Sequence, residues 1–108
     1  MGNKYHAKHT EVDGLKFDSL KESRRWNDLK IRERIGEIKN LARQIPFKLR
    51  AHGQDICVLR MDFTYDEKQG DKWVTVFEDV KGYDGGTPSW KLKSKIFEAQ
   101  FNVKIRIT

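Results

Sequence analysis

Two β-type runs joined by a short polar segment constrain the fold of this 108-residue chain more than any other feature. Residues 55–65 (DICVLRMDFTY) and 73–81 (WVTVFEDVK) are rich in the β-branched, aromatic and aliphatic residues that favour strands. The segment between them, residues 66–72 (DEKQGDK), has the composition of a turn. The pattern predicts a β-hairpin, so two neighbouring strands of one sheet are expected at the centre of the fold.

A helix is predicted before this hairpin, over about residues 19–35. Ser19 and Glu22 match the S-x-x-E capping box that marks a helix start. Good helix formers follow, and Gly36 stands where a helix commonly ends. Because Glu22 suits this capping role, helix capping is one interpretation of it and a functional role is the other.

Three further elements complete the predicted order. Pro46 excludes a central strand, and the alternating Phe47 and Leu49 after it predict an edge strand before the hairpin. Thr87-Pro88 predicts the start of a second helix, which reaches about Gln100. Alternating apolar residues over 103–107 predict a last strand. The predicted order is αβββαβ, an α/β fold with a mixed sheet flanked by helices.

Length and composition indicate one soluble, basic domain. A chain of this length usually forms one domain, divided here into a basic N-terminal arm or short ribbon over residues 1–17 and a folded domain over residues 18–108. The net charge is +6, and three Trp, three Tyr and six Phe argue against a disordered basic tail. The single cysteine excludes an internal disulfide and a cysteine-based zinc cage. No secretory signal or membrane span is expected, so a cytoplasmic location is predicted.

Two aspartates stand inside predicted strands, where aspartate is uncommon and costly to bury without a partner. Asp62 interrupts an apolar run, and Asp79 follows another. Because side chains alternate along a strand, Asp79 and Lys81 should point to one face while Glu78 and Val80 point to the other. We therefore expect Asp62, Asp79 and Lys81 to converge at one edge of the sheet.

Such a cluster has a specific chemistry. Carboxylates a few ångströms apart repel one another unless a cation neutralises them, and hard oxygen ligands suit Mg²⁺, with Mn²⁺ as a substitute. A metal held there lowers the pKa of a bound water and polarises a phosphoryl oxygen. Lys81 is placed either to stabilise charge that develops at phosphorus or to orient the attacking water. Glu22 adds a third carboxylate if its helix packs on the sheet. The alternative for Lys81 is a surface lysine at a strand end.

The predicted order, the isolated Asp62 and the segment Asp79-Val80-Lys81 resemble the PD-(D/E)XK nuclease superfamily. This resemblance implies that Glu22, Asp62 and Asp79 are metal ligands, that the Val80 carbonyl is a further ligand, and that Lys81 is the catalytic lysine. Gln44 resembles a strand glutamine that accompanies these sites in several branches, and a satisfied amide beside Pro46 is its alternative. Glu78 is expected to support the site from the opposite face. Met61 precedes Asp62, where part of the superfamily has proline.

The match is closer still to a family of small phage- and prophage-borne nuclease-like proteins. The resembling segments are Asn3-Lys4-Tyr5, residues 14–19 (GLKFDS), Glu22, Arg43-Gln44 and residues 78–82 (EDVKG), and they span nearly the whole chain. The resemblance implies a Mg²⁺-dependent DNA endonuclease that acts on branched DNA, like Holliday-junction resolvases, as a homodimer. Its expected setting is phage DNA recombination or replication in the cytoplasm of a bacterial host.

Basic residues outside the acidic cluster are candidates for phosphate contacts. Their alternative, taken singly, is a solvated surface; they are Lys4, Lys8, Arg24, Arg25, Arg43, Lys91, Lys93 and Lys95. Among the other notable side chains, Cys57, Trp26, Trp73, Trp90 and Phe97 are expected in the core, with base stacking as an alternative for Trp90. Two other functions stay open, namely a non-catalytic nucleic-acid-binding accessory protein and a ribonuclease of the same chemistry.

Overall fold

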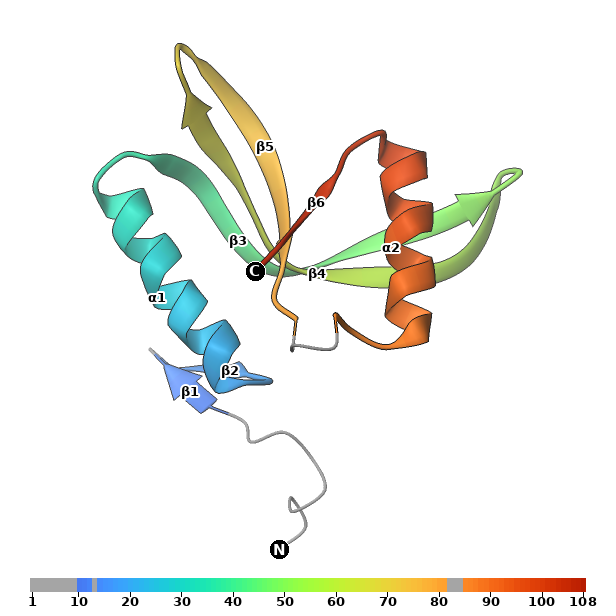
Figure 1. Cartoon of the computed structure of the whole chain (residues 1–108), viewed down its shortest axis with the longest axis horizontal. Helices are drawn as coiled ribbons and strands as arrows, with labels where there is room; N and C mark the ends of the chain where they lie inside the picture. Colours follow the sequence, from blue (N-terminus) through green and yellow to red (C-terminus); the bar gives the residue numbers. More distant parts are fainter. Residues whose placement is uncertain (1–9, 13, 82–84) are drawn as a thin grey trace, which may run out of the picture.

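The computed structural model describes residues 10–12, 14–81 and 85–108, and these residues form a mixed α/β fold (Figure 1). The N-terminal Lys4 and Lys8 lie outside the described residues. From the first helix onward the order of elements is αβββαβ, as predicted. The elements are β1 (Thr10–Val12), β2 (Leu15–Phe17), α1 (Leu20–Arg34), β3 (Ile38–Ala51), β4 (Gln54–Gln69), β5 (Lys72–Asp79), α2 (Pro88–Phe101) and β6 (Ile105–Ile107).

The described strands form a four-stranded sheet and a separate ribbon. The sheet order is β3-β4-β5-β6, in which β3–β4 and β4–β5 are antiparallel and β5–β6 is parallel, so the sheet is mixed. Helix α2 makes the crossover between the two parallel strands. Strand β3 lies at the edge, as Pro46 predicted. Strands β1 and β2 pair with each other as a two-stranded ribbon within residues 1–17.

The helix predictions are confirmed by their caps. The Ser19 hydroxyl accepts a hydrogen bond from the Glu22 N–H at 3.1 Å, which starts α1. The Thr87 hydroxyl accepts one from the Trp90 N–H at 3.1 Å, with Pro88 in the first turn of α2. No helix among the described residues has the length and apolar character needed to cross a membrane.

The predicted seven-residue turn over 66–72 is wrong. Strand β4 continues to Gln69 and β5 begins at Lys72, so only Gly70 and Asp71 form the turn. Several of the polar residues stay in the strands because they find partners there. Asp66, for example, accepts a hydrogen bond from the Thr75 hydroxyl of β5 at 2.8 Å.

Two apolar clusters hold the helices to the sheet. The cluster at α1 consists of Phe17, Trp26, Leu29, Ile38, Phe63, Tyr65 and Val76. The cluster at α2 consists of Leu49, Leu59, Met61, Phe97 and Ile105, with Phe47, Cys57, Phe77 and Trp90 packed against it. Val76 and Phe77 are successive residues of β5, so the two helices cover opposite faces of that strand.

The core predictions hold for the cluster residues and fail for one tryptophan. Trp26 is buried and stacks on Phe63 with ring centroids 6.0 Å apart, and Phe97 is fully buried. Cys57 and Trp90 are half-buried. Trp73 is 41% exposed, because it lies near the β4–β5 turn, where the Lys39 ammonium covers its ring at 4.3 Å.

Candidate functional site

Strands β4 and β5 bring two aspartates into contact. Asp62 lies in β4, and Asp79 is the last residue of β5. The Asp62 N–H donates to Asp79 Oδ1 at 3.2 Å, and the Val80 N–H donates to Asp62 Oδ2 at 2.8 Å. The alternation expected from the sequence therefore places Asp62 and Asp79 side by side on the sheet.

Gln44 joins Glu22 to this pair. Its Nε2 donates to Glu22 Oε2 at 2.8 Å and to Asp62 Oδ1 at 3.3 Å. Gln44 has a φ of 54°, in the left-handed region that few non-glycine residues adopt, so local strain accompanies its position in β3. Glu22, in the first turn of α1, is only 3% exposed. The helix therefore packs so that its cap-box glutamate faces the sheet aspartates.

Lys81 is held on the other side of Asp79. Its ammonium forms an ion pair with Asp79 Oδ2 and lies 4.1 Å from the centroid of the Trp90 ring. Gly86 has a φ of 100°, which favours glycine, and a Cβ atom there would crowd Lys81 Cδ at 3.1 Å and Trp90 Cε3 at 3.2 Å. Lys81 is thus fixed between a carboxylate and an indole ring.

The electrostatics of the site reflect three carboxylates in a small volume. Burial, the neighbouring Asp79 and then Glu22 raise the pKa of Asp62 to about 7. Burial and the nearby Asp18 raise the pKa of Glu22 above its ordinary value. Burial is the largest cause of both shifts, and neighbouring carboxylates add to it, so a bound cation would favour the ionised forms of both groups.

The residues present fit a hard divalent cation. Asp79 Oδ2 is buried and is ion-paired with the Lys81 ammonium. Asp62 and Asp79 supply oxygen donors, and Mg²⁺ typically uses one or two carboxylates together with waters and phosphate. The described residues contain no ready-made group of three acidic, histidine or cysteine ligands. Gln44 lies between Glu22 and Asp62. Metal ligation by Asp62, Asp79, Glu22 and the Val80 carbonyl stays a prediction.

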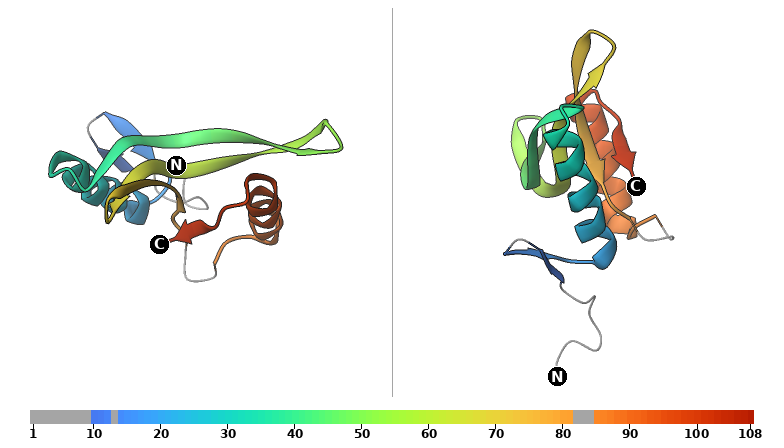
Figure 2. Two further views of the ribbon diagram at one scale, coloured as in Figure 1. Left: turned by 90° about the horizontal axis from the view of Figure 1, so that it is seen from above. Right: turned by 90° about the vertical axis from the view of Figure 1, so that its left-hand side faces the viewer.

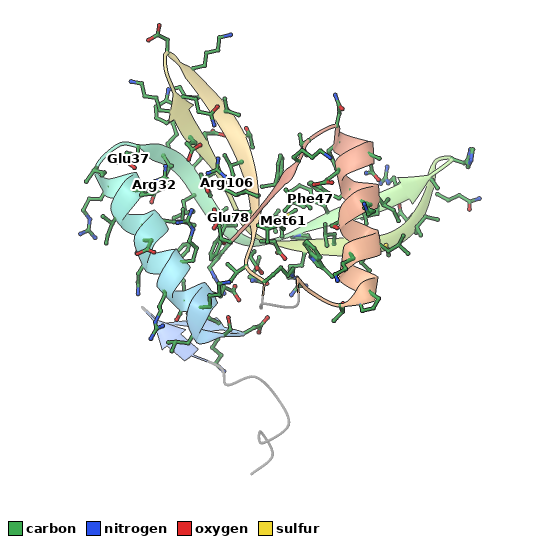
Figure 3. The ribbon with its side chains drawn as sticks, viewed as in Figure 1. Arg32, Glu37, Phe47, Met61, Glu78 and Arg106 are labelled. Carbon is green, nitrogen blue, oxygen red and sulfur yellow. The ribbon has the colours of Figure 1, made fainter. Side chains whose placement is uncertain are left out.

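Glu78 lies on the opposite face of β5 and fastens α1 to the sheet (Figure 3). Arg25 of α1 donates to its two oxygens at 2.5 and 3.0 Å, the Tyr65 hydroxyl donates to Oε1, and Thr108 donates to Oε2 at 3.0 Å. Burial acts to raise its pKa, but these donors together lower it. Arg25 follows Glu22 by one helical turn, so this contact sets where Glu22 lies.

The predicted phosphate-binding residues divide into free and engaged groups. Arg24, Lys91 and Lys95 are exposed. Arg25 is bound to Glu78, and Arg43 donates to the Lys16 carbonyl at 2.7 Å while its guanidinium stacks on Phe17. These two arginines therefore stabilise the fold around the site, and phosphate contact by them stays a prediction.

The sequence reasoning missed two contacts of the site. The Trp90 ring against Lys81 joins α2 to the end of β5, and Tyr65 against Glu78 joins β4 to β5. The sequence held a signal for the second contact. Phe63 pairs with Glu78 across the two strands, and Tyr65 lies two residues after Phe63, so Tyr65 and Glu78 lie on the same face of the sheet. No sequence signal pointed to the first contact.

Asp62→Asn is expected to stabilise the metal-free protein at high pH. Because the folded-state pKa of Asp62 is raised to about 7, the folded protein binds a proton that the unfolded chain releases near pH 4. The wild-type free energy of unfolding therefore falls between about pH 4 and pH 7 by an amount on the order of a few kcal/mol. Urea unfolding in EDTA should show Asp62→Asn more stable than wild type at pH 8 and equal to it at pH 4. A stability difference between Asp62→Asn and wild type that is constant with pH would contradict this expectation.

Comparison with known proteins gives one match. A family model described as "Protein of unknown function (DUF1064)" matches residues 2–108, almost the whole chain. No curated protein and no solved structure matches.

Proposed function

This chain belongs to the DUF1064 family of proteins of unknown function, and we propose that it is a metal-dependent DNA endonuclease. The observation that carries the proposal is the contact between Asp62 and Asp79, with Lys81 paired to Asp79 and Glu22 linked through Gln44. Two adjacent carboxylates beside a fixed ammonium group suit phosphodiester hydrolysis, in which negative charge builds up on a phosphoryl oxygen. The PD-(D/E)XK resemblance implies the same chemistry.

Each side chain has a separate task in this proposal. Asp62 and Asp79 would hold Mg²⁺, or Mn²⁺ in its place, and the bound metal would supply an activated water and polarise the phosphoryl oxygen. Lys81 donates hydrogen bonds to the phosphate as its charge increases. Trp90 limits the positions of the Lys81 ammonium, and Gln44 orients both Glu22 and Asp62.

The proposed substrate is branched DNA, such as a Holliday junction, in phage recombination or replication. The described residues form one fold without a separate part for reading a base sequence, which favours recognition of DNA shape. Two strands must be cut at a junction, and a homodimer with twofold symmetry supplies two sites.

Cleavage of a DNA panel tests this function. Purified protein with Mg²⁺ is mixed with a four-way junction, a flap, a nicked duplex and a plain duplex of shared sequence. We expect cleavage of the branched substrates and none in EDTA. Cleavage that persists in EDTA would overturn the metal mechanism. Binding without cleavage in Mg²⁺ or Mn²⁺ would favour the non-catalytic accessory protein, and preferential cutting of matched RNA would favour a ribonuclease.

A further inference from the structure

The β3–β4 hairpin extends beyond the rest of the sheet and leaves one of its faces open (Figure 2). We name this surface the ribbon face and define it as Pro46, Lys48 and Arg50 of β3 with Val58 and Arg60 of β4. All five residues are exposed, and the register pairs Pro46 with Arg60 and Lys48 with Val58. The intervening residues point the other way, into the cluster beneath α2.

The ribbon face is continuous with the candidate site. Gln44 and Asp62 lie opposite each other, between the pairs Arg43–Phe63 and Ile45–Met61. Because strand side chains alternate with a period of two, Asp62, Arg60 and Val58 follow one another on one face of β4. Four residues at ~3.3 Å each place Val58 about 13 Å from Asp62 along the strand.

The chemistry of this surface is basic and partly apolar. Residues 46–60 contain three Lys or Arg side chains, namely Lys48, Arg50 and Arg60, and one carboxylate, Asp55. Arg50 pairs with Asp55 at 2.7 Å, while Lys48 lies 3.9 Å from it with a 65% exposed side chain. Val58 is 47% exposed beside these cations. The surface can therefore attract a polyanion and also contact its apolar parts.

The N-terminal half of α2 borders the ribbon face. The Lys93 ammonium donates to the Val58 carbonyl at 3.3 Å. A cavity of about 290 Å³ lies between the two elements, lined among others by Arg60, Trp90 and Lys93. Since Trp90 also contacts Lys81, this cavity connects the ribbon to the proposed catalytic lysine.

We propose that the ribbon face binds the backbone of duplex DNA that extends from the candidate site. The inference rests on the proposed function only for the position of the cut, because binding itself requires no cleavage. The cations of the ribbon face lie on one exposed surface, where they can contact phosphates along the duplex. A duplex rises ~3.4 Å per base pair, so Val58 lies about four base pairs from the scissile phosphate.

Binding of a fluorescein-labelled 30-base-pair duplex in EDTA tests this surface. The double variant Lys48→Gln/Arg60→Gln should bind roughly tenfold more weakly. The slope of its log Kd plotted against the logarithm of salt concentration should be smaller by about 2. The matched control Lys68→Gln/Lys72→Gln removes the same charge at the β4–β5 turn and should change affinity little. Equal losses in both variants, or no loss in the first, would overturn the proposal.

Site-specific crosslinking tests position independently of net charge. The chain has one cysteine, so Cys57→Ser/Val58→Cys carries a single thiol on the ribbon face that accepts an aryl-azide label. We expect this label to crosslink to the duplex, whereas the same label in Cys57→Ser/Val74→Cys, on β5, should not. Equal crosslinking at both positions, or stronger crosslinking to a single strand of the same sequence, would overturn the proposal. Duplex binding and crosslinking are both measured without metal. They therefore test DNA binding by the ribbon face even if the protein does not cleave DNA.

Discussion

Asp79→Asn is expected to reduce Mg²⁺-dependent DNA cleavage by roughly a thousandfold, equivalent to about 4 kcal/mol of transition-state stabilisation. Asp79 is the residue on which the site converges, since Oδ1 accepts the Asp62 N–H and Oδ2 faces Lys81. The substitution keeps the shape and the acceptor for Asp62 but removes the negative charge. The substitution should therefore weaken metal binding and leave the Lys81 ammonium less firmly positioned. Single-turnover cleavage of a four-way junction at saturating protein measures the loss.

The control for this experiment is Asp71→Asn, which removes an aspartate at the β4–β5 turn, away from the site. It should cleave like wild type. Asp79→Asn should still bind the junction in EDTA, because a carboxylate that repels phosphate has been neutralised. Cleavage by Asp79→Asn within tenfold of wild type would contradict the role of Asp79. Loss of both cleavage and binding would indicate misfolding, which the far-UV circular dichroism of the variant would show.

Local signals in the sequence were enough to predict the order of elements. Caps depend on residues three apart, as in Ser19 and Glu22, and the structure forms these contacts directly. The alternation of strand side chains likewise predicted that Asp79 and Lys81 share a face, opposite Glu78. These features could be predicted because each depends only on near neighbours in the chain.

Features that depend on tertiary partners could not be predicted in this way. Asp66 and Glu67 have turn-type composition, yet partners on other elements keep them in β4. Arg25 resembles a free basic residue of a helix face, but its partner Glu78 is 53 residues away in the sequence. From the sequence, Gln44 was equally consistent with a site residue and with a satisfied amide beside Pro46. The packing of α1 shows that it links Glu22 to Asp62.

A network of ion pairs connects α1 to the sheet behind the candidate site (Figure 3). One part of it joins Arg25 to the fully buried Glu78. Another part joins Arg32 of α1 and Arg106 of β6 to Glu67, each at 2.9 Å. Removing one member of a buried pair leaves the other charge without compensation, and this costs far more than losing a surface pair.

The second large effect is expected on stability, from Glu78→Ala. The substitution leaves Arg25 and the Tyr65 hydroxyl without their acceptor and opens a cavity at a position with no exposure. We expect the free energy of unfolding to fall by about 3–5 kcal/mol at pH 7. Glu37→Ala breaks a similar Arg–Glu pair at the surface, at 2.9 Å, and should cost less than about 1 kcal/mol. Urea unfolding of both variants measures the difference.

The pH dependence of Glu78→Ala separates the lost charge from the lost packing. The pKa of Glu78 is lowered in the folded protein, so its ionic contribution is complete above the ordinary value of 4.5 and is lost as pH falls through the folded-state pKa. The difference between wild type and Glu78→Ala should therefore narrow in acid, and what remains there measures packing. A difference that does not change with pH would contradict an ionic role for Glu78. Because Arg25 and Glu22 share the first turns of α1, the same variant should also weaken Mg²⁺-dependent cleavage under conditions where it is still folded.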